Sequence, residues 1–311
     1  MSEPLVTVLL TTYNRCRILP RAVQSVLNGT YRNFELLILD DASSDGTQDY
    51  AVALTDPRIR YERLPVNGGV LRSRNRGFDQ ARGEIVTLLD DDDELCPDAL
   101  ATAVGELERL AQEAVEILWL NCVEAESNQP SGFMPGGESQ IHFQDYLCGR
   151  FHGDFWLVFR SSALAGHRFD ERLRAQESLL WLRIHREHRA WFVPKVVCRK
   201  YRRHGGERLC HLDVRMRQLQ HTTLAMQMFD TEFGQDLAAA APSVYGAKLA
   251  YLGLHQMAIA RFPTGRSSVL RSLRYRFSLK YLLMYLASFF MSARTVTHVL
   301  RRIEFGQTDA P

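Results

Sequence analysis

The sequence predicts an α/β fold in which a mainly parallel sheet has helices on both faces and is followed by a helical C-terminal region. Strand-like and helix-like segments alternate four times in the first 90 residues, which is typical of βα units around a parallel sheet. The strand-like segments are almost continuously apolar, as expected for strands covered on both faces. Beyond about residue 213, apolar residues recur at helical spacing instead.

The elements of the first hundred residues follow one another with clear boundaries. Asn28-Gly29 ends the first helix, which begins near residue 19. A turn-forming cluster at 40–46 precedes a short helix that reaches about residue 54, and a longer helix spans 70–81. The four strands are expected at residues 5–10, 34–39, 59–64 and 85–89.

The rest of the chain divides into a further α/β part and a helical part. A proline- and glycine-rich segment at 129–137 is expected to be a loop. Helices are expected at 97–113 and 178–185, and strands at 117–122 and 155–159. We therefore predict one domain over residues 1–213 and a helical region over 214–311 that is interrupted at 262–265.

Charge is distributed unevenly along this 311-residue chain, although its net charge is only +2. Residues 261–303 contain nine Lys or Arg and no Asp or Glu, whereas residues 1–260 contain 29 basic and 34 acidic residues. A small net charge does not indicate nucleic-acid binding. The basic C-terminal segment instead suggests a surface for anionic lipid or another polyanion.

The cysteines and the N-terminal residues favour a cytoplasmic protein. Six scattered cysteines, with no CxxC pair, are typical of reduced structural thiols. The first residues lack the basic and apolar regions of a signal peptide. The longest uncharged run, 281–293, is shorter than the roughly 20 residues that span a bilayer.

Polar side chains follow three of the predicted strands at the point where each strand ends. Thr11-Thr12-Tyr13-Asn14 follows the first strand, Asp40-Asp41 the second, and four consecutive aspartates, Asp90 to Asp93, the fourth. Ligands of parallel sheets bind at the carboxyl ends of the strands, so these residues should line one crevice. The glycine-rich phosphate loops of dinucleotide-binding and P-loop proteins are absent from the sequence.

The four aspartates predict a site for a divalent metal. Two like charges about 4 Å apart repel by about 4 kcal/mol at an effective dielectric constant of 20. Carboxylate oxygens are the ligands that Mg²⁺ and Mn²⁺ prefer, and a bound ion would relieve this repulsion. In an extended chain Asp90 and Asp92 share one face. The alternative is a solvated acidic turn in which Asp93 caps the helix after Pro97.

Together these segments resemble the family-2 glycosyltransferases of GT-A type. The resemblance covers residues 4–100, and a second, weaker region covers 155–204. It implies a Rossmann-like, mainly parallel sheet, with nucleotide-sugar binding in 1–100 and the acceptor side of the catalytic domain in 101–213. The motifs that carry it are Thr11-Thr12-Tyr13-Asn14-Arg15, the segment 39–47, Asn67-Gly68-Gly69, Arg74-Asn75-Arg76-Gly77, Ala81-Arg82-Gly83-Glu84 and Leu89-Asp90-Asp91-Asp92-Asp93.

The resemblance implies a role for each donor-side position. Thr11, Tyr13 and Asp41 correspond to positions that hold the nucleotide base, with Asp41 accepting a hydrogen bond from a base N–H. Asp90 and Asp91 correspond to positions on the ribose and phosphate side of the site.

The resemblance also implies which residues bind the metal and the diphosphate. Asp92 corresponds to the metal-binding aspartate. Arg74 lies beside the donor-binding loop, where a cation suits the diphosphate; the alternative is an arginine on a helix surface. Arg202 and His204 belong to a basic, glycine-hinged segment that would close over the diphosphate, although a plain solvated loop would have the same composition.

The general base is inferred from its distance to Arg183. The family places an acid, usually the aspartate of a Glu-Asp pair, six residues before an arginine of the acceptor-side helix. Here Glu177 stands six residues before Arg183, and the usual pair is replaced by Gln176-Glu177. Glutamate can abstract the acceptor proton with one extra methylene of reach. The alternative is an ordinary acid at a helix N-terminus.

The resulting hypothesis is an inverting, non-processive glycosyltransferase that depends on Mn²⁺ or Mg²⁺. The donor would be a UDP- or dTDP-sugar, and the acceptor a glycan or lipid-linked glycan, as in the assembly of lipopolysaccharide or another surface polysaccharide. The membrane spans and the Gln-x-x-Arg-Trp signature of processive synthases are absent from the sequence, and so is the phosphate loop of nucleotidyltransferases. A non-catalytic protein that binds a sugar nucleotide is the alternative from another functional class.

The basic segment 261–303 has two interpretations. Leu279, Leu283 and Leu286 are three of its apolar residues that recur at helical spacing. Such a helix could lie in the interface of the inner face of the membrane and bring the protein to a lipid-linked acceptor. It could equally pack on the catalytic domain or on a second subunit of a homodimer, since every core helix has an apolar stripe.

Overall fold

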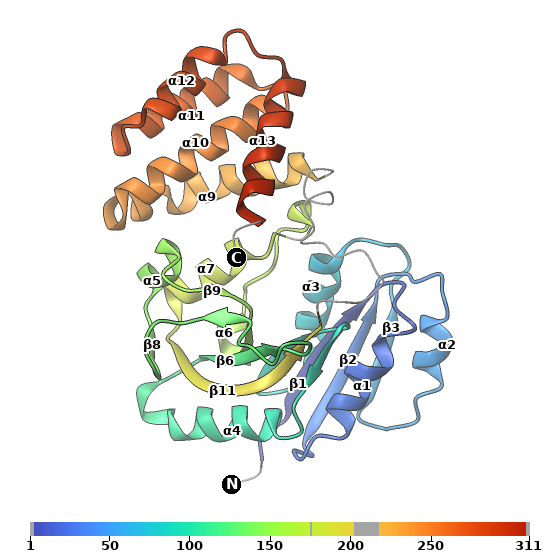
Figure 1. Cartoon of the computed structure of the whole chain (residues 1–311). Helices are drawn as coiled ribbons and strands as arrows, with labels where there is room; N and C mark the ends of the chain where they lie inside the picture. The colour runs from blue at the N-terminus through green and yellow to red at the C-terminus, as the bar shows by residue number, and fades with distance from the viewer. Residues whose placement is uncertain (1–2, 175, 202–217, 309–311) are drawn as a thin grey trace. The chain divides into compact units, whose positions relative to one another are not determined.

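The computed structural model describes residues 3–174, 176–201 and 218–308. The chain divides into two compact units, residues 1–206 and 207–311 (Figure 1). Each unit has its own hydrophobic core. The expected domain boundary after residue 213 lies outside the described residues.

The N-terminal unit is built on one mixed sheet, and the predicted α/β fold is confirmed. Nine strands form this sheet in the described part of the unit, eight of them in the order β3-β2-β1-β4-β10-β6-β11-β5, with β8 on β11. β1 pairs in parallel with both β2 and β4, and β2 pairs in parallel with β3. The parallel strands are β1 (Val6–Thr12), β2 (Phe34–Asp40), β3 (Ile59–Arg63) and β4 (Ile85–Asp90).

The first four helices lie close to their expected positions. α1 begins at Leu19 with a proline in its first turn and ends before Asn28, where the apolar spacing stops. α3 packs against β1 through Gly77, where an added Cβ would lie 2.2 Å from Cδ1 of Leu9. The bounds are α1 Leu19–Leu27, α2 Thr47–Val52, α3 Val70–Gln80 and α4 Ala99–Arg109, followed by a 3-10 turn, η1, at Ala111–Glu113.

The second half of the sheet contains a long strand that the sequence pattern did not predict. β11 (Ala190–Lys200) pairs in parallel with β6 (Ile117–Glu124), and its register shifts between Val193 and Val196. The irregularity accommodates Pro194, which has no N–H to donate. The proline and the neighbouring lysine break the apolar run, and so they conceal the strand in the sequence.

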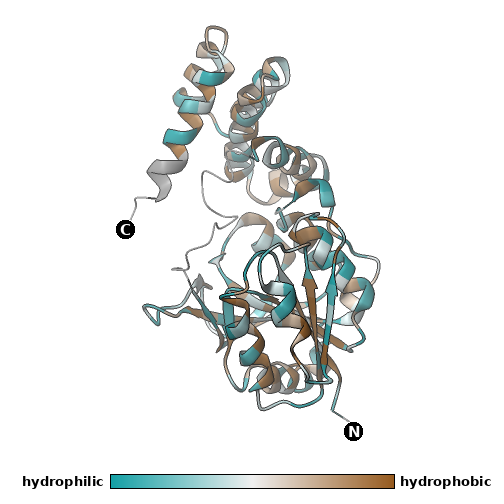
Figure 2. Ribbon diagram, turned by 90° about the vertical axis from the view of Figure 1, so that its right-hand side faces the viewer, coloured by the Kyte–Doolittle hydropathy of each residue, from teal (hydrophilic) through white to brown (hydrophobic). Residues whose placement is uncertain are grey.

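The remaining strands complete the sheet and one small ribbon. β10 (Phe155–Arg160) lies antiparallel between β4 and β6, while β5 (Asp93–Leu95) and β8 (Ser139–Ile141) pair with β11. Figure 2 shows hydrophobic stretches along strands inside this unit. The segment 129–137, expected to be a loop, contributes β7 to a two-stranded sheet. Its strands are β7 (Gly132–Phe133) and β9 (His152–Gly153).

Short helices connect the strands in the second half of this unit. Among them, α7 runs from Ser178 to Glu187 and confirms the helix expected at 178–185. The others are α5 (Phe143–Cys148), α6 (Ser161–Leu164) and the 3-10 turn η2 (Glu171–Leu173).

The C-terminal unit is helical, as expected. α10 packs against α9, α11 and α13, and Leu254, Val269, Val296 and Leu300 are buried between them. The expected interruption at 262–265 is wrong: α11 begins at Phe262, and the proline lies in the first turn, where its missing N–H breaks no helical bond. The helices are α9 (Leu219–Ala240), α10 (Pro242–Ala258), α11 (Phe262–Tyr275), α12 (Leu279–Ala287) and α13 (Ala293–Thr308). Among the described residues, every helix is too short or too polar to cross a bilayer.

Candidate active site

The loops after β1 and β2 are joined to each other at the carboxyl edge of the sheet. Asn14 has a positive φ of 52°, and its side-chain oxygen accepts a hydrogen bond from the Ser44 N–H at 2.7 Å. The Asn14 N–H in turn donates to Oγ of Ser43 at 2.8 Å. Asparagine tolerates this left-handed conformation better than most residues do. The two polar loops therefore form one connected edge of the crevice.

The three residues predicted to hold the base lie at this edge. Thr11 is on β1, with Asp90 as its register partner on β4, and Tyr13 follows the strand with 46% of its surface exposed. Asp41 is buried, and its two carboxylate oxygens accept hydrogen bonds from the Gly68 and Gly69 N–H groups at 2.9 and 2.7 Å. Asp41 thus holds the glycine loop that leads into α3, while its contact with a base stays a prediction.

The aspartate run turns sharply after Asp90, where β4 ends, and three of its carboxylates converge. Oxygen atoms of Asp90, Asp92 and Asp93 all lie within 4.8 Å of one another. Asp91 points elsewhere and accepts a hydrogen bond from the Thr12 hydroxyl at 2.7 Å. Burial raises the pKa of Asp91 to about 7. The expected common side of Asp90 and Asp92 agrees with this arrangement, and the turn adds Asp93 to it.

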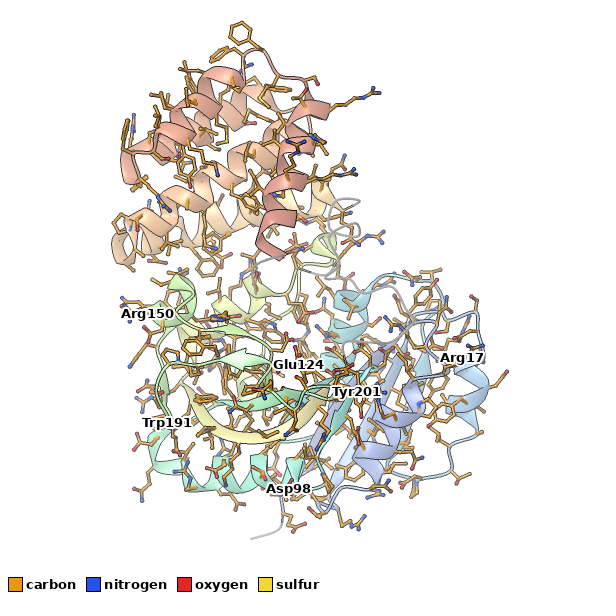
Figure 3. The ribbon with its side chains drawn as sticks, in the orientation of Figure 1. Arg17, Asp98, Glu124, Arg150, Trp191 and Tyr201 are labelled. Carbon is orange, nitrogen blue, oxygen red and sulfur yellow. The ribbon has the colours of Figure 1, made fainter. Side chains whose placement is uncertain are left out.

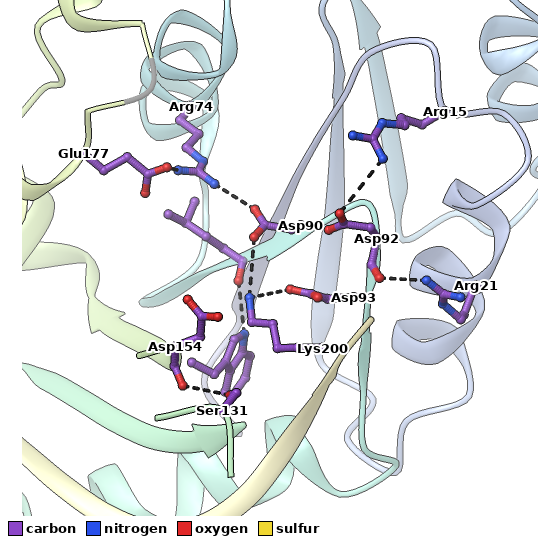
Figure 4. A network of polar contacts seen from close by, with 12 residues as sticks. Arg15, Arg21, Arg74, Asp90, Asp92, Asp93, Ser131, Asp154, Glu177 and Lys200 are labelled. Carbon is purple, nitrogen blue, oxygen red and sulfur yellow. Dashed lines mark hydrogen bonds and ion pairs between the residues drawn. The ribbon is translucent and has the colours of Figure 1, made fainter. Parts of the chain in front are cut away.

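Lys200, which sequence reasoning missed, lies inside the aspartate cluster. Its Nζ is 2.5 Å from Asp93 and 3.5 Å from Asp90 (Figure 4). Burial alone would lower the pKa of Lys200, but the two carboxylates outweigh it and hold that pKa well above its usual value. Because Asp93 pairs with Lys200, it does not cap α4, whose N-cap residue is Asp98. In the sequence, the one feature that could have indicated Lys200 was its position just before the basic residues that follow Tyr201.

Arg74 connects the aspartate cluster to Glu177, the predicted base. Its guanidinium donates to Asp90 at 2.8 Å and also forms an ion pair with Glu177 (Figure 4). Only 7% of the Arg74 side chain is exposed, so the alternative of a helix-surface arginine is wrong. Burial alone would raise the pKa of Asp90. The positive charges of Lys200 and Arg74 outweigh burial and hold the pKa of Asp90 below its usual value.

Glu177 is the N-cap residue of α7, and neighbouring contacts hold the start of this helix close to α3. The side chain of Asn75 on α3 accepts from the Phe169 N–H at 2.8 Å and donates to the Phe169 carbonyl at 3.0 Å. It also donates to Glu171 of η2 at 3.1 Å. Arg74 and its neighbour Asn75 therefore both hold the segment that ends in Glu177.

Aromatic packing fixes the body of α7 against the sheet. Trp119 of β6 donates its indole N–H to Nε2 of His185 at 2.9 Å, and Nδ1 of His185 lies 2.7 Å from the Trp181 carbonyl. These partners assign the proton of the neutral ring to Nδ1. Trp181 stacks on Phe159 of β10 with ring centroids 5.2 Å apart. α7 is thus held over β6 and β10.

Further cations lie on the other side of the cluster. Arg15 lies 4.0 Å from the carboxylate of Asp92, and Arg21 donates to the Asp92 carbonyl at 2.7 Å. The Arg21 guanidinium also lies 3.5 Å above the ring of Tyr201, and the Tyr201 hydroxyl donates to Glu94 at 2.5 Å. Tyr201 is labelled in Figure 3. Arg202 and His204, predicted to contact phosphate, lie outside the described residues.

The cluster suits a hard divalent cation. Asp90, Asp92 and Asp93 offer converging carboxylate oxygens, which are the ligands that Mn²⁺ and Mg²⁺ prefer. Lys200 and Arg74 already contribute positive charge at the same carboxylates. A metal ion would therefore compete with Lys200 for Asp90 and Asp93.

Comparisons with known proteins identify the family of this chain. Residues 7–164, just over half of the chain, match the family described as glycosyl transferase family 2. The chain belongs to that family. Over 199 residues it is 35% identical to the GalNAc(5)-diNAcBac-PP-undecaprenol beta-1,3-glucosyltransferase of Campylobacter jejuni, a match that covers 62% of this chain and 63% of that protein.

Two solved structures share the fold of this family 2 chain. TarS 1–349 of S. aureus in complex with UDP-GlcNAc has a TM-score of 0.60 at 16% identity, covering 86% of this chain and 89% of that chain. The mannosyltransferase PcManGT of Pyrobaculum calidifontis, in complex with GDP-Man and Mn²⁺, has a TM-score of 0.55 at 21% identity. That match covers 92% of this chain and 80% of that chain. The expected GT-A fold is confirmed.

Proposed function

We propose that this protein transfers a sugar from a UDP- or dTDP-sugar to a hydroxyl of a glycan or lipid-linked glycan, with inversion and with Mn²⁺ or Mg²⁺. The observation that carries the proposal is the position of Arg74. It joins Asp90, on the predicted donor side, to Glu177, the predicted base on the acceptor side. A donor and an acceptor bound at these two carboxylates would be neighbours, as a direct displacement requires.

The proposed reaction is a single displacement. Glu177 takes the proton of the acceptor hydroxyl as its oxygen forms a bond to the anomeric carbon. The bond from that carbon to the diphosphate breaks on the opposite side, and its electron pair leaves with the nucleoside diphosphate. A metal held by Asp92, with Asp90 and Asp93 beside it, would offset the charge on the leaving group.

The chain's own cations support binding of a diphosphate. Lys200 and Arg74 lie beside Asp90, and Arg15 and Arg21 lie beside Asp92. Charged donors of this kind form stronger hydrogen bonds to phosphate than neutral ones do. Tyr13, exposed after β1, is available to stack on a base, and we assign the base to its end of the crevice.

The relatives support a lipid-linked acceptor. The Campylobacter protein is named for glucosyl transfer onto an undecaprenol-linked glycan. An acceptor of that chemistry would be presented at a membrane, and the basic, apolar segment 261–303 could reach it there. We therefore propose a peripheral contact with the cytoplasmic face of the membrane as part of the same function.

Substitution of Glu177 tests the proposed base. In Glu177→Gln the side chain keeps its size but cannot accept a proton, so turnover should fall by about 10²- to 10⁴-fold. Donor binding should survive, because Glu177 contacts the proposed donor residues only through Arg74, whose pair with Asp90 is kept. Glu177→Asp keeps a carboxylate with one methylene less reach and should retain part of the activity. Turnover with a panel of UDP- and dTDP-sugars, and thermal shifts with the nucleotides alone, measure both effects.

The exposed Glu113 of η1 provides the matched control. Glu113→Gln removes the same charge from the same unit and should leave turnover unchanged. Wild-type turnover in Glu177→Gln would rule out the proposed base. Donor binding by the wild type without turnover on any acceptor would favour the non-catalytic alternative, which the comparisons do not favour.

A further inference from the structure

A second group of possible metal ligands lies outside the aspartate cluster. One ligand atom each of His167, Glu187 and His188 lies within 4.8 Å of the others. His167 follows α6, Glu187 is the last residue of α7, and His188 caps that helix. Glu177 caps the start of the same helix, so the histidine group and the proposed base lie at opposite ends of α7.

One distance in this group equals that expected between two ligands of a tetrahedral ion. Ligands bound to zinc at about 2.0–2.1 Å lie about 3.4 Å apart at tetrahedral angles. Nε2 of His167 lies 3.4 Å from the Glu187 carboxylate. The rings of His167 and His188 are T-shaped, with their centroids 5.8 Å apart. Two imidazoles and one carboxylate leave one coordination position for water.

Glu116 gives this group the outer partner that a metal-binding histidine needs. Its carboxylate lies 2.8 Å from Nδ1 of His188, which leaves Nε2 of that ring for a metal. A carboxylate behind a histidine ligand orients the ring and increases its basicity. The Ser162 hydroxyl donates to the other oxygen of Glu116 at 3.1 Å and holds it in place. Glu116 and Ser162 thus form an outer layer behind His188, as expected for a metal-binding histidine.

The surroundings also favour a cation. The C-terminal end of a helix carries partial negative charge, and Glu187 and His188 lie at that end of α7. The neighbouring guanidinium groups have other partners: Arg168 binds Asp79 at 2.6 Å, and Arg189 donates to the Glu113 carbonyl at 2.7 Å.

We propose that His167, Glu187 and His188 bind one zinc-class transition-metal ion, with Glu116 orienting His188. Imidazole suits Zn²⁺, Ni²⁺ and Cu²⁺, whereas the all-carboxylate cluster at Asp90 suits Mn²⁺ or Mg²⁺. The ion would fasten the end of α7 to the segment after α6 and, through Glu116, to the start of β6. It would link these elements at a place separate from the residues proposed for the transfer reaction.

Zinc titration of the full-length protein tests this site. Asp92→Asn serves as the background, because it weakens the aspartate cluster and leaves the histidine group intact. Metal-free protein in this background should bind one Zn²⁺ by equilibrium dialysis and should melt several degrees higher with zinc, but not with Mg²⁺. His167→Ala or His188→Ala should weaken zinc binding at least tenfold. Glu116→Gln should weaken it by about 10- to 100-fold, since it removes only the outer partner.

His142, an exposed histidine at the N-cap of α5, provides the control. His142→Ala should bind zinc like the background protein. Spectra of Co²⁺-substituted protein should show tetrahedral coordination that is lost in His167→Ala. The proposal is overturned if the background protein binds no Zn²⁺ at micromolar free zinc, or if the His167 and His188 variants bind it with unchanged affinity.

Discussion

At the scale of single residues, Lys200 determines how the aspartate cluster is stabilised without a metal. Its ammonium group pairs with Asp93 and lies 3.5 Å from Asp90. Removing one partner of a buried ion pair typically costs about 3–5 kcal/mol, because the other charge is left uncompensated. The same ammonium group competes with any divalent ion for those carboxylates, so Lys200 sets both the stability of the metal-free site and its affinity for metal.

Lys200→Met should bind Mn²⁺ more tightly than the wild type while being less stable without it. The substitution keeps most of the side-chain volume and removes the competing charge. We expect the dissociation constant for Mn²⁺ to fall about tenfold, which corresponds to about 1.4 kcal/mol. The melting temperature of the metal-free variant should fall and should recover when Mn²⁺ is added. Isothermal titration and thermal unfolding measure the two effects.

Lys195, on the same strand, provides the matched control. It is exposed and pairs with Glu106 at 2.6 Å, away from the aspartates. Lys195→Met should leave Mn²⁺ affinity unchanged. Equal Mn²⁺ affinity in Lys200→Met and wild type would show that the metal does not bind at this cluster.

At the scale of elements, α7 connects the proposed base to the core of the N-terminal unit. Glu177 caps its first turn, and His185, in its last turn, is buried against Trp119 of β6. Burial lowers the pKa of His185 to about 4. If the His185 ring bound a second proton, its Nε2–H would face the Trp119 N–H, and two donors would meet without an acceptor. The neutral form is therefore part of the packing that holds α7 in place.

The contribution of His185 to stability should consequently fall as the pH is lowered from 6.5 towards 4, because only the unfolded state binds the His185 proton in that window. Above pH 6.5 the contribution is fully present. At pH 5 the loss should be about 2 kcal/mol relative to pH 7.5. In the wild type the raised pKa of Asp91 acts in the opposite direction over the same range, so urea unfolding at the two pH values is compared with a variant that lacks the His185 proton.

His185→Gln isolates this contribution from the other titrating groups. Glutamine can accept from Trp119 and donate to the Trp181 carbonyl, but it does not titrate in this range. Other groups titrate alike in both proteins, so the difference in unfolding free energy between them should shrink by about 2 kcal/mol between pH 7.5 and 5. A constant difference would mean that His185 is not buried in its neutral form.

At the scale of the whole molecule, the two units differ in charge and in exposed apolar surface. The segment 261–303 of the C-terminal unit contains nine basic and no acidic residues. α12 has no buried residue, and the bend after it exposes 93% of Phe290. Exposed leucine and phenylalanine among basic side chains match an anionic membrane surface, where apolar groups insert and cations meet lipid phosphate.

The protein should therefore sediment with vesicles that contain phosphatidylglycerol, and less with vesicles of phosphatidylcholine alone. High salt should weaken this binding, because it screens the basic side chains. Replacing Phe290 with serine should reduce the bound fraction severalfold, since an inserted aromatic side chain contributes about 1.5–3 kcal/mol. The assay is cosedimentation at two salt concentrations.

Phe133, more than half exposed on β7 of the other unit, serves as the control, and Phe133→Ser should bind vesicles like the wild type. Loss of a dimer in Phe290→Ser, measured by sedimentation velocity with vesicle binding unchanged, would assign this surface to a second subunit instead.

The sequence by itself was sufficient to predict the parallel half of the sheet and the polar residues that follow its strands. Continuous apolar runs and helical spacing placed β1 to β4 and α1 to α3 within a few residues, because one face or both faces of each element are buried. β11 escaped prediction because Pro194 and Lys195 interrupt its apolar pattern. Motif spacing also indicated the polar edge and the candidate residues Asp92 and Glu177.

Only the tertiary structure decided which of these residues meet. Arg74 is separated from Glu177 by about a hundred positions in the chain, and Lys200 from Asp93 by just as many, yet each pair is in contact. The sequence pattern reports whether a side chain faces the core or the solvent, because burial repeats with the period of the element. It does not report contacts between distant elements, which depend on strand order and on the packing of α3 and α7 against the sheet. The ion pairs of the crevice and the histidine group at the end of α7 therefore emerged only from the folded chain.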